Sequence, residues 1–320
     1  MSLVVAGNVI SDLINRILTK ATISKFYVAE SGSLRNLVIS PDHIIVVGGA
    51  PGSGKTSLVG QCVGDFLRLN TGHRALICNV EMTPEELMMR EIGRISGVDM
   101  TTDRADDFST EELAQIKGCI ATFAQYASRL FIMSPPIFLN DIEMAIANYN
   151  PDLVVVDYLQ RVNISDNDLD SNERLKISRI MTDLRKLVTN RTIIVVSALR
   201  RQGKSNYESS EMGLASFRET SEIEYSVNDA YLLVPDNIAA KNGDENRFIL
   251  RHEKSRGGQK KDINLSFDGR YHRWSGIDDD IEDLTYLFKS TAQGGDSDVS
   301  AKVNALWAGH QRQKVVSNEL

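Results

Sequence analysis

Apolar positions near the start of the chain repeat at helical spacing. Between Val4 and Leu18 they recur along one helical face, and polar residues such as Ser11 and Asp12 lie between them. This pattern predicts an amphipathic helix whose apolar stripe needs a partner. Two partners stay open: the helix packs on its own domain, or it docks on a neighbouring subunit.

From His43 onward, short runs rich in β-branched residues alternate with helical patterns. Alternation of this kind predicts an α/β fold, with a parallel sheet that helices cover on both faces. The expected strands cover residues 44–49, 75–80, 153–157 and 192–198, and the expected helices begin near Lys55, Pro84 and Asn172.

After Tyr225 the pattern changes to strands alone. Apolar runs separated by Gly and Asn turns cover residues 229–234, 247–255 and 263–274, which predicts an antiparallel edge on the same sheet. From about Ser290 the composition shifts to Ser, Gly, Asp, Gln and Asn, as in a mobile tail. We therefore expect an N-terminal helix and linker over residues 1–40, one α/β domain over 41–278 and a flexible extension over 279–320.

The composition indicates a soluble chain with one substantial core. It has 320 residues, 42% of them hydrophobic, and a net charge of −7. We expect no export signal and no membrane partner, because no apolar run is long enough to span a bilayer. The three cysteines lie singly, without disulfide or zinc spacing, so a cytoplasmic location is expected. The negative charge argues against a general nucleic-acid coat but leaves room for a local basic channel.

A phosphate-binding motif follows the first expected strand. Residues 49–56 match GxxxxGK[ST] between a β-run and a helix start, which is the context this motif requires. Its backbone N–H groups surround phosphates, Lys55 reaches the β- and γ-phosphates, and the Thr56 hydroxyl binds Mg²⁺. The sequence therefore predicts a site for ATP and Mg²⁺. The expected nucleotide-binding residues are Gly49, Ala50, Pro51, Gly52, Ser53, Gly54, Lys55, Thr56 and Ser57.

Two carboxylates at strand ends complete the expected site. Asp157 ends an apolar strand, as the Walker B carboxylate of a Mg²⁺ site does. The next residue, Tyr158, cannot supply the carboxylate that activates water, so this base must come from another strand. Glu81 follows the strand over residues 75–80, and the carboxyl ends of parallel strands gather at the ligand crevice. The alternative is that Glu81 belongs to the start of the next helix, with Thr83 as its cap.

Further motifs follow in order along the chain. They are Asn79-Val80-Glu81-Met82-Thr83 with Leu87-Met88-Met89-Arg90, Asp157-Tyr158-Leu159-Gln160, residues 172–187, Phe217-Arg218-Glu219-Thr220, Asp229, and Lys254-Ser255-Arg256-Gly257-Gly258. Together they resemble the C-terminal ATPase domain of DnaB-like hexameric replicative helicases, over residues 44–274. The resemblance implies a RecA-like P-loop ATPase fold, with Glu81 as the catalytic base and Asp157 as the Walker B residue.

The turn at residues 254–258 resembles the family element that reaches the neighbouring subunit's nucleotide site. The resemblance implies that Arg256 is an arginine finger and Lys254 its companion, so that hydrolysis depends on subunit contact. It also implies a homo-oligomer, a hexameric ring, that moves 5′ to 3′ on single-stranded DNA in replication. A replication or loader protein would be a further partner.

The chain departs from the family pattern in two places. Where the family has a polar sensor, this chain has Ala198, whose methyl group makes no hydrogen bond to a γ-phosphate. The helicases carry a collar domain and a linker helix in front of the P-loop, whereas only a short segment precedes it here. Residues 4–18 are the expected linker-like helix.

The expected DNA-binding loop is basic. In rings of this type, loops facing the pore bind the DNA backbone, so basic and polar loop residues are the candidates. Residues 162–171 are acidic and unsuited to phosphate, whereas the loop over residues 200–212 carries Arg200, Arg201 and Lys204. A solvated basic loop without a DNA contact is the alternative.

Three functions stay open on the sequence alone. The leading hypothesis is an ATP-driven helicase or translocase on single-stranded DNA, with nucleotide bound between subunits. The second is a RecA-superfamily regulatory or loader ATPase that switches partner binding without unwinding DNA, which Ala198 and the acidic net charge favour. The third is a filament-forming strand-exchange recombinase, against which the motifs at residues 157–160 and 254–258 count.

Overall fold

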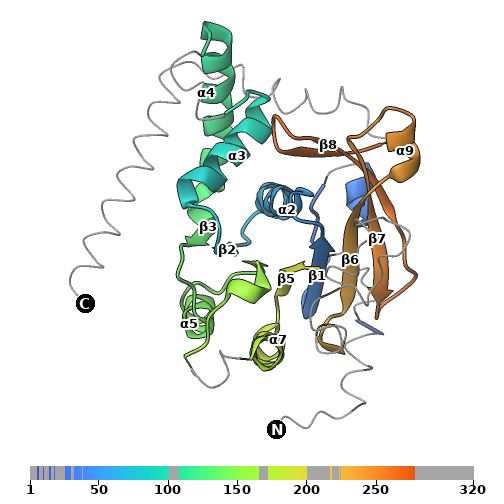
Figure 1. Cartoon of the computed structure of the whole chain (residues 1–320). Helices are drawn as coiled ribbons and strands as arrows, with labels where there is room; N and C mark the ends of the chain where they lie inside the picture. The colour runs from blue at the N-terminus through green and yellow to red at the C-terminus, as the bar shows by residue number, and fades with distance from the viewer. Residues whose placement is uncertain are drawn as a thin grey trace, which may run out of the picture.

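The computed structural model describes residues 26–29, 32–37, 39–100, 108–165, 172–199 and 225–277, together with residues 6, 10, 14, 15, 18, 217 and 223. Within these ranges the strands form one nine-stranded sheet in the order β3-β2-β4-β5-β1-β6-β7-β8-β9 (Figure 1). The neighbours from β3 to β6 are parallel, and β7, β8 and β9 extend the sheet antiparallel. This arrangement confirms the α/β fold with an antiparallel C-terminal edge.

The elements have the following bounds. The strands are β1 (His43–Gly49), β2 (Ala75–Asn79), β3 (Leu130–Met133), β4 (Leu153–Asp157), β5 (Thr192–Ala198), β6 (Asp229–Pro235), β7 (Arg247–Ser255), β8 (Ile263–Asp268) and β9 (Arg273–Gly276). The helices are α2 (Lys55–Leu69), α3 (Pro84–Ser96), α4 (Thr110–Ala124), α5 (Leu139–Tyr149), α7 (Glu173–Leu187) and α9 (Asn237–Lys241), with 3₁₀ turns η1 (Ser33–Asn36), η3 (Ala127–Arg129) and η4 (Leu159–Arg161).

Helices cover both faces of the parallel strands. On one face, α5 and α7 place Ile142, Ile146, Ile177 and Leu184 against alternate residues of β1, β4 and β5. On the other face, α2 packs its apolar side against the remaining residues of the same strands (Figure 1). The central strands are therefore buried on both sides, which is why they read as continuous apolar runs in the sequence.

Local sequence signals set the start of α3. Thr83 accepts a hydrogen bond from the backbone N–H of Glu86, and the Glu86 side chain accepts one from the N–H of Thr83. Pro84 occupies the first helical position, where its missing N–H costs no hydrogen bond. Thr83 is thus the helix cap, as its position after the strand predicts.

The apolar pattern missed some elements and merged others. The short strand β3 and the helices α4 and α5 were not predicted, and α4 buries only Cys119 among its residues, so its pattern carries little signal. The expected strand over residues 263–274 is wrong, since β8 and β9 form a hairpin there. Residues 269–272, which include Gly269, form the turn between the two strands and are not paired in the sheet.

Several predicted segments lie largely outside the described residues. In the N-terminal helix, the described positions Ala6, Ile10, Ile14, Asn15 and Leu18 are helical. Ile10, Ile14 and Leu18 are 55%, 48% and 75% exposed in the single chain. The basic loop with Arg200, Arg201 and Lys204, the acidic stretch from 166 to 171 and the C-terminal extension are outside the described part. Among the helices that the structure describes, none has the length and apolar content to span a bilayer.

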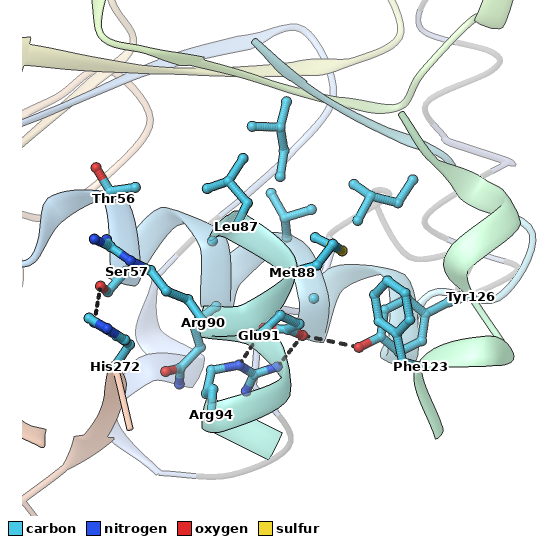
Figure 2. A pocket seen from close by; sticks show the side chains of 16 residues that line it. Thr56, Ser57, Leu87, Met88, Arg90, Glu91, Arg94, Phe123, Tyr126 and His272 are labelled. Atoms are coloured by element: carbon cyan, nitrogen blue, oxygen red, sulfur yellow. Dashed lines mark hydrogen bonds and ion pairs between the residues drawn. The ribbon is translucent and has the colours of Figure 1, made fainter. Parts of the chain in front are cut away.

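A buried ion-pair network joins α2 to α3. The Arg94 guanidinium, 9% exposed, contacts the Glu91 carboxylate at 2.8 Å and the Asp65 carboxylate at 3.3 Å. The Tyr126 hydroxyl donates to Glu91 at 3.0 Å (Figure 2). The network matters because the removal of Arg94 would leave Glu91 and Asp65 charged in the protein interior without their shared cation.

Replacement of Arg94 with Met is expected to lower the free energy of unfolding by about 3–5 kcal/mol, because Glu91 loses its buried counter-ion and Asp65 keeps only the more distant Arg68. Urea denaturation measures this loss. The matched control is Arg247→Met, which removes a more exposed pair with Asp244 and should cost at most about 1 kcal/mol. Equal losses in the two variants would contradict the expected difference.

Candidate nucleotide-binding site

A cleft of about 550 Å³ opens where four neighbouring strands end. The ends of β1 and β5 contribute Gly49 and Ala198, and the segments at the ends of β2 and β4 contribute Glu81 and Asp157. The cleft also contains the start of α2. Its lining includes these predicted residues: Gly49, Pro51, Gly52, Gly54, Lys55, Thr56, Ser57, Glu81 and Asp157.

The loop between β1 and α2 has the geometry of a phosphate-binding loop. Gly52 and Gly54 have φ of 76° and 83°, in the left-handed region that glycine adopts without steric cost. A Cβ atom on Gly54 would also lie 2.8 Å from the Trp274 ring. Lys55 Nζ donates to the carbonyl oxygens of Gly49 and Ala50 at 3.0 and 2.7 Å. These contacts hold the lysine over the loop, beside the N-terminus of a helix that favours anions.

Asp157 and Thr56 meet inside the cleft. Asp157 is buried, and its carboxylate accepts a hydrogen bond from the Thr56 hydroxyl. Burial raises the pKa of the Asp157 carboxyl to about 6, and the nearby positive charge of Lys55 opposes that rise. A hydroxyl and a carboxylate side by side are hard oxygen donors, which fit Mg²⁺ shared with nucleotide phosphates. In the described chain no cluster of three or more His, Cys, Asp or Glu side chains could hold a metal by itself.

Asn79 joins the two carboxylate segments. Strand β2 ends at this residue, one position earlier than predicted. Its Oδ1 accepts from the backbone N–H groups of Glu81 and Met82 at 2.9 and 2.8 Å, and its Nδ2 donates to Asp157 at 3.3 Å. The amide thus sets the turn that carries Glu81 and ties it to Asp157. From the sequence, Asn79 is part of a motif and has no predicted role.

The cleft also contains residues that were not assigned to the site from the sequence, among them Arg90, Phe267 and His272. Arg90 reaches from α3 toward Thr56 and Ser57 (Figure 2). Burial lowers the pKa of its guanidinium, and the negative charges of Glu86, Asp157 and Glu81 oppose this effect. Phe267 and His272 come from the β8–β9 hairpin. Two signals for Arg90 were available in the sequence: it belongs to the motif at residues 87–90, and it follows the buried Leu87 by three helical positions.

Lys254 and Arg256 do not enter the cleft of their own chain. Lys254 Nζ donates to the carbonyl of Val227 at 2.9 Å, and the exposed Arg256 side chain contacts the carbonyl of Tyr225. Both lie where β7 ends, away from the residues that line the cleft. In the single chain, the cleft is therefore lined without these two cations.

Strand β5 ends at Ala198, the position where the family resemblance predicts a polar sensor. Ala198 lines the cleft, and its backbone N–H donates to Gln160 Oε1 at 3.2 Å. Gln160 Nε2 also donates to the Ser197 hydroxyl at 3.0 Å. Gln160 thereby ties the segment after β4 to the end of β5.

A phosphate-binding loop between a parallel strand and the helix it starts, with carboxylates at the neighbouring strand ends, defines a P-loop ATPase of the RecA-like class. The family model of the DnaB-like helicase C-terminal domain matches residues 37–276. The chain therefore belongs to the DnaB-like helicase C-terminal domain family.

Replicative DNA helicases are similar to this chain in sequence. The chain is 23% identical over 248 residues to a probable plasmid replicative DNA helicase of Chlamydia trachomatis, covering 76% of this chain and 52% of that protein. It is 23% identical over 239 residues to the replicative DNA helicase DnaB of Buchnera aphidicola, covering 72% and 51%. The chain thus spans about half the length of these relatives.

Solved structures share the fold. One of them, the structure of an ATPase domain, has a TM-score of 0.73 at 16% identity, covering 87% of this chain and 100% of that one. A DnaB-like replicative helicase, described with its interactions with primase, has a TM-score of 0.66 at 19% identity, covering 74% and 59%. These matches establish the RecA-like ATPase fold of helicases for this chain.

Proposed function

We propose that this chain is the ATPase motor of a DnaB-like DNA helicase or translocase, which hydrolyses ATP and acts on single-stranded DNA in replication. The observation that carries this proposal is the convergence of Lys55, Thr56, Glu81 and Asp157 in one cleft. Membership in the helicase family supports the substrate class.

Each cleft residue has a proposed role. Lys55 and the amides of the loop would bind the phosphates, and Thr56 with Asp157 would hold Mg²⁺, whose charge would offset the negative charge of the phosphates. Glu81 is exposed to the cleft, where it orients and deprotonates the attacking water. Asn79 holds the backbone at Glu81, so the base stays near the metal-binding carboxylate.

Arg256 and Lys254 are proposed to act on the nucleotide of a neighbouring subunit in a homo-oligomer, a hexameric ring. Their position outside their own cleft supports this assignment. A cation against the γ-phosphate would stabilise transition-state charge only when two subunits touch. ATP turnover would then depend on assembly.

Arg256→Ala is expected to lower ATP turnover by about 10³-fold or more, as the loss of an arginine finger does. Subunit mixing tests whether the effect acts in trans. Arg256→Ala and Glu81→Gln proteins should each turn over slowly alone, but a mixed ring would contain sites with Glu81 from one chain and Arg256 from the next. Recovered turnover on mixing supports a shared site, and its absence in rings shown to be mixed argues against one. The matched control is Arg251→Ala, earlier on β7.

The DNA substrate is tested by ATP hydrolysis with and without single-stranded DNA across a salt series. A motor should be stimulated strongly, and the stimulation should fall as salt rises because phosphate contacts are electrostatic. Hydrolysis that is indifferent to DNA would exclude the motor. Arg200, Arg201 and Lys204 remain the proposed DNA-binding residues.

A second function has one specific observation in its favour. Ala198 presents a methyl group to the cleft where a polar sensor is expected. A regulatory or loader ATPase would couple its nucleotide state to a protein partner and would not unwind DNA. Hydrolysis without DNA stimulation, together with nucleotide-dependent binding of a replication protein, would favour this function.

A further inference from the structure

The β8–β9 hairpin forms one wall of the nucleotide cleft. His272 lies just before β9 with a φ of 51°, a left-handed conformation uncommon for a residue with a side chain. Its Nδ1 atom lies 3.3 Å from the Ser57 hydroxyl (Figure 2). Ser57 directly follows Thr56 in the first turn of α2. The hairpin therefore places an imidazole beside the phosphate-binding loop, from a position 215 residues away in the chain.

Contacts to α2 and α3 fix this hairpin in place. Gln61 of α2, which is 7% exposed, donates to the Trp274 carbonyl at 2.8 Å and accepts from the Trp274 N–H at 2.9 Å. The Arg273 guanidinium donates to the carbonyl of Arg94 near the end of α3. The Trp274 ring occupies the space that a side chain at Gly54 would need. The imidazole is thus held in position before any ligand binds, which lowers the entropic cost of a contact.

The chemistry of this corner suits an anion. Lys55 and Arg90 line the same cleft as His272. Burial lowers the pKa of the His272 imidazole, as does the positive charge of Arg90, while the charge of Asp99 opposes them. A neutral imidazole that accepts from the Ser57 hydroxyl at Nδ1 carries its proton on Nε2, where it can donate. Within the described chain, Nε2 makes no hydrogen bond to a protein group.

We propose that His272 is a nucleotide-binding residue that donates a hydrogen bond to the phosphate beside Ser57, and that Gln61 is the residue that positions it. The ligands are nucleoside di- and triphosphates. This inference rests on the proposed ATPase function. It adds a contact to the phosphate that is attached to the nucleoside, away from the terminal phosphate that is cleaved. A terminal phosphate bound between Lys55 and Glu81 would leave the first phosphate near the start of α2, where Ser57 lies.

The test compares wild-type protein with His272→Asn. Asparagine tolerates the left-handed backbone but is too short to donate where Nε2 lies, so the hairpin should fold unchanged. The Kd of Mg-ADP, measured by titration calorimetry, should rise about tenfold with the loss of a hydrogen bond to a charged group. The KM for ATP should rise similarly while kcat stays within about twofold, because this contact is equal in ground and transition states.

Two further variants separate binding from folding. Arg270→Ala alters the same turn at a side chain that is 70% exposed and pairs with Asp268, so the Kd of Mg-ADP should not change. Gln61→Ala should weaken Mg-ADP binding through the hairpin. If Gln61 acts through His272, the double variant should bind no more weakly than the weaker of the two single variants.

Wild-type affinity for Mg-ADP in His272→Asn would overturn this inference. A parallel fall in kcat and in thermal stability would also overturn it, since that result indicates a structural role for His272 alone. Failure of the wild-type protein to bind Mg-ADP would overturn the proposed function and the inference together. Wild-type binding of Mg-ADP that His272→Asn leaves unchanged would overturn the inference alone.

Discussion

The Lys55→Ala variant is expected to lose ATP turnover, with kcat lowered by at least about 10²- to 10³-fold, as when one preorganised charge-stabilising group is removed. The ammonium is held on the loop by the carbonyls of Gly49 and Ala50, and burial lowers its pKa against the opposing charges of Asp157 and Glu81. Alanine removes the cation that would meet the β- and γ-phosphates. A coupled phosphate-release assay with saturating single-stranded DNA measures the loss.

The control for this variant is Lys241→Ala, at the exposed end of α9 and outside the cleft. Its turnover should match that of the wild type. Thermal unfolding of Lys55→Ala should be close to that of the wild type, because Lys55 donates to two backbone carbonyls and Asp157 keeps its hydrogen bonds from Thr56 and Asn79. DNA-dependent hydrolysis retained by Lys55→Ala would contradict the assignment of the nucleotide-binding site.

Glu81→Gln is expected to bind ATP normally and to hydrolyse it about 10²- to 10⁴-fold more slowly, the range for the loss of a general base. Binding should survive because Asn79 holds the backbone N–H of Glu81 and makes no bond to its carboxylate. Equilibrium binding of ATP and single-turnover hydrolysis separate the two effects. Normal turnover would show that the base lies elsewhere in the cleft.

Glu85→Gln is the matched control for Glu81→Gln. Glu85 lies in the first turn of α3, four positions further along, and is exposed without lining the cleft. The same loss of negative charge should leave turnover unchanged there. A similar fall in both variants would indicate that the general charge near α3 matters, and not a base at Glu81.

Features set by short stretches of chain could be predicted from the sequence. The phosphate-binding loop needs a left-handed backbone at two positions, and the motif places Gly52 and Gly54 there. The cap at Thr83 depends on residues three positions apart. The continuous apolar runs of β4 and β5 indicate strands that are buried on both faces of the sheet. These runs therefore predicted the sheet and the strand ends at Asp157 and Ala198.

Weak local patterns account for the missed elements. The four-residue strand β3 is too short for a clear period, and α4 buries so little that its apolar residues do not form a stripe. The hairpin at residues 263–276 looked like one run because aromatic residues continue through its turn. In each case the local sequence is compatible with more than one structure, and packing selects one of them.

The sequence by itself determined the phosphate-binding loop, the α/β class and the strand-end carboxylates, because these depend on residues that are neighbours in the chain. Only the tertiary structure decided that Arg90 and His272 face this loop, that Gln61 pairs with the backbone of Trp274, and that the Arg256 turn lies outside its own cleft. The contacts of Arg90, His272 and Gln61 join α3 and the β8–β9 hairpin to α2. Their partners are far apart in the chain, so no local period records them, and they form only when the packed core brings the elements together.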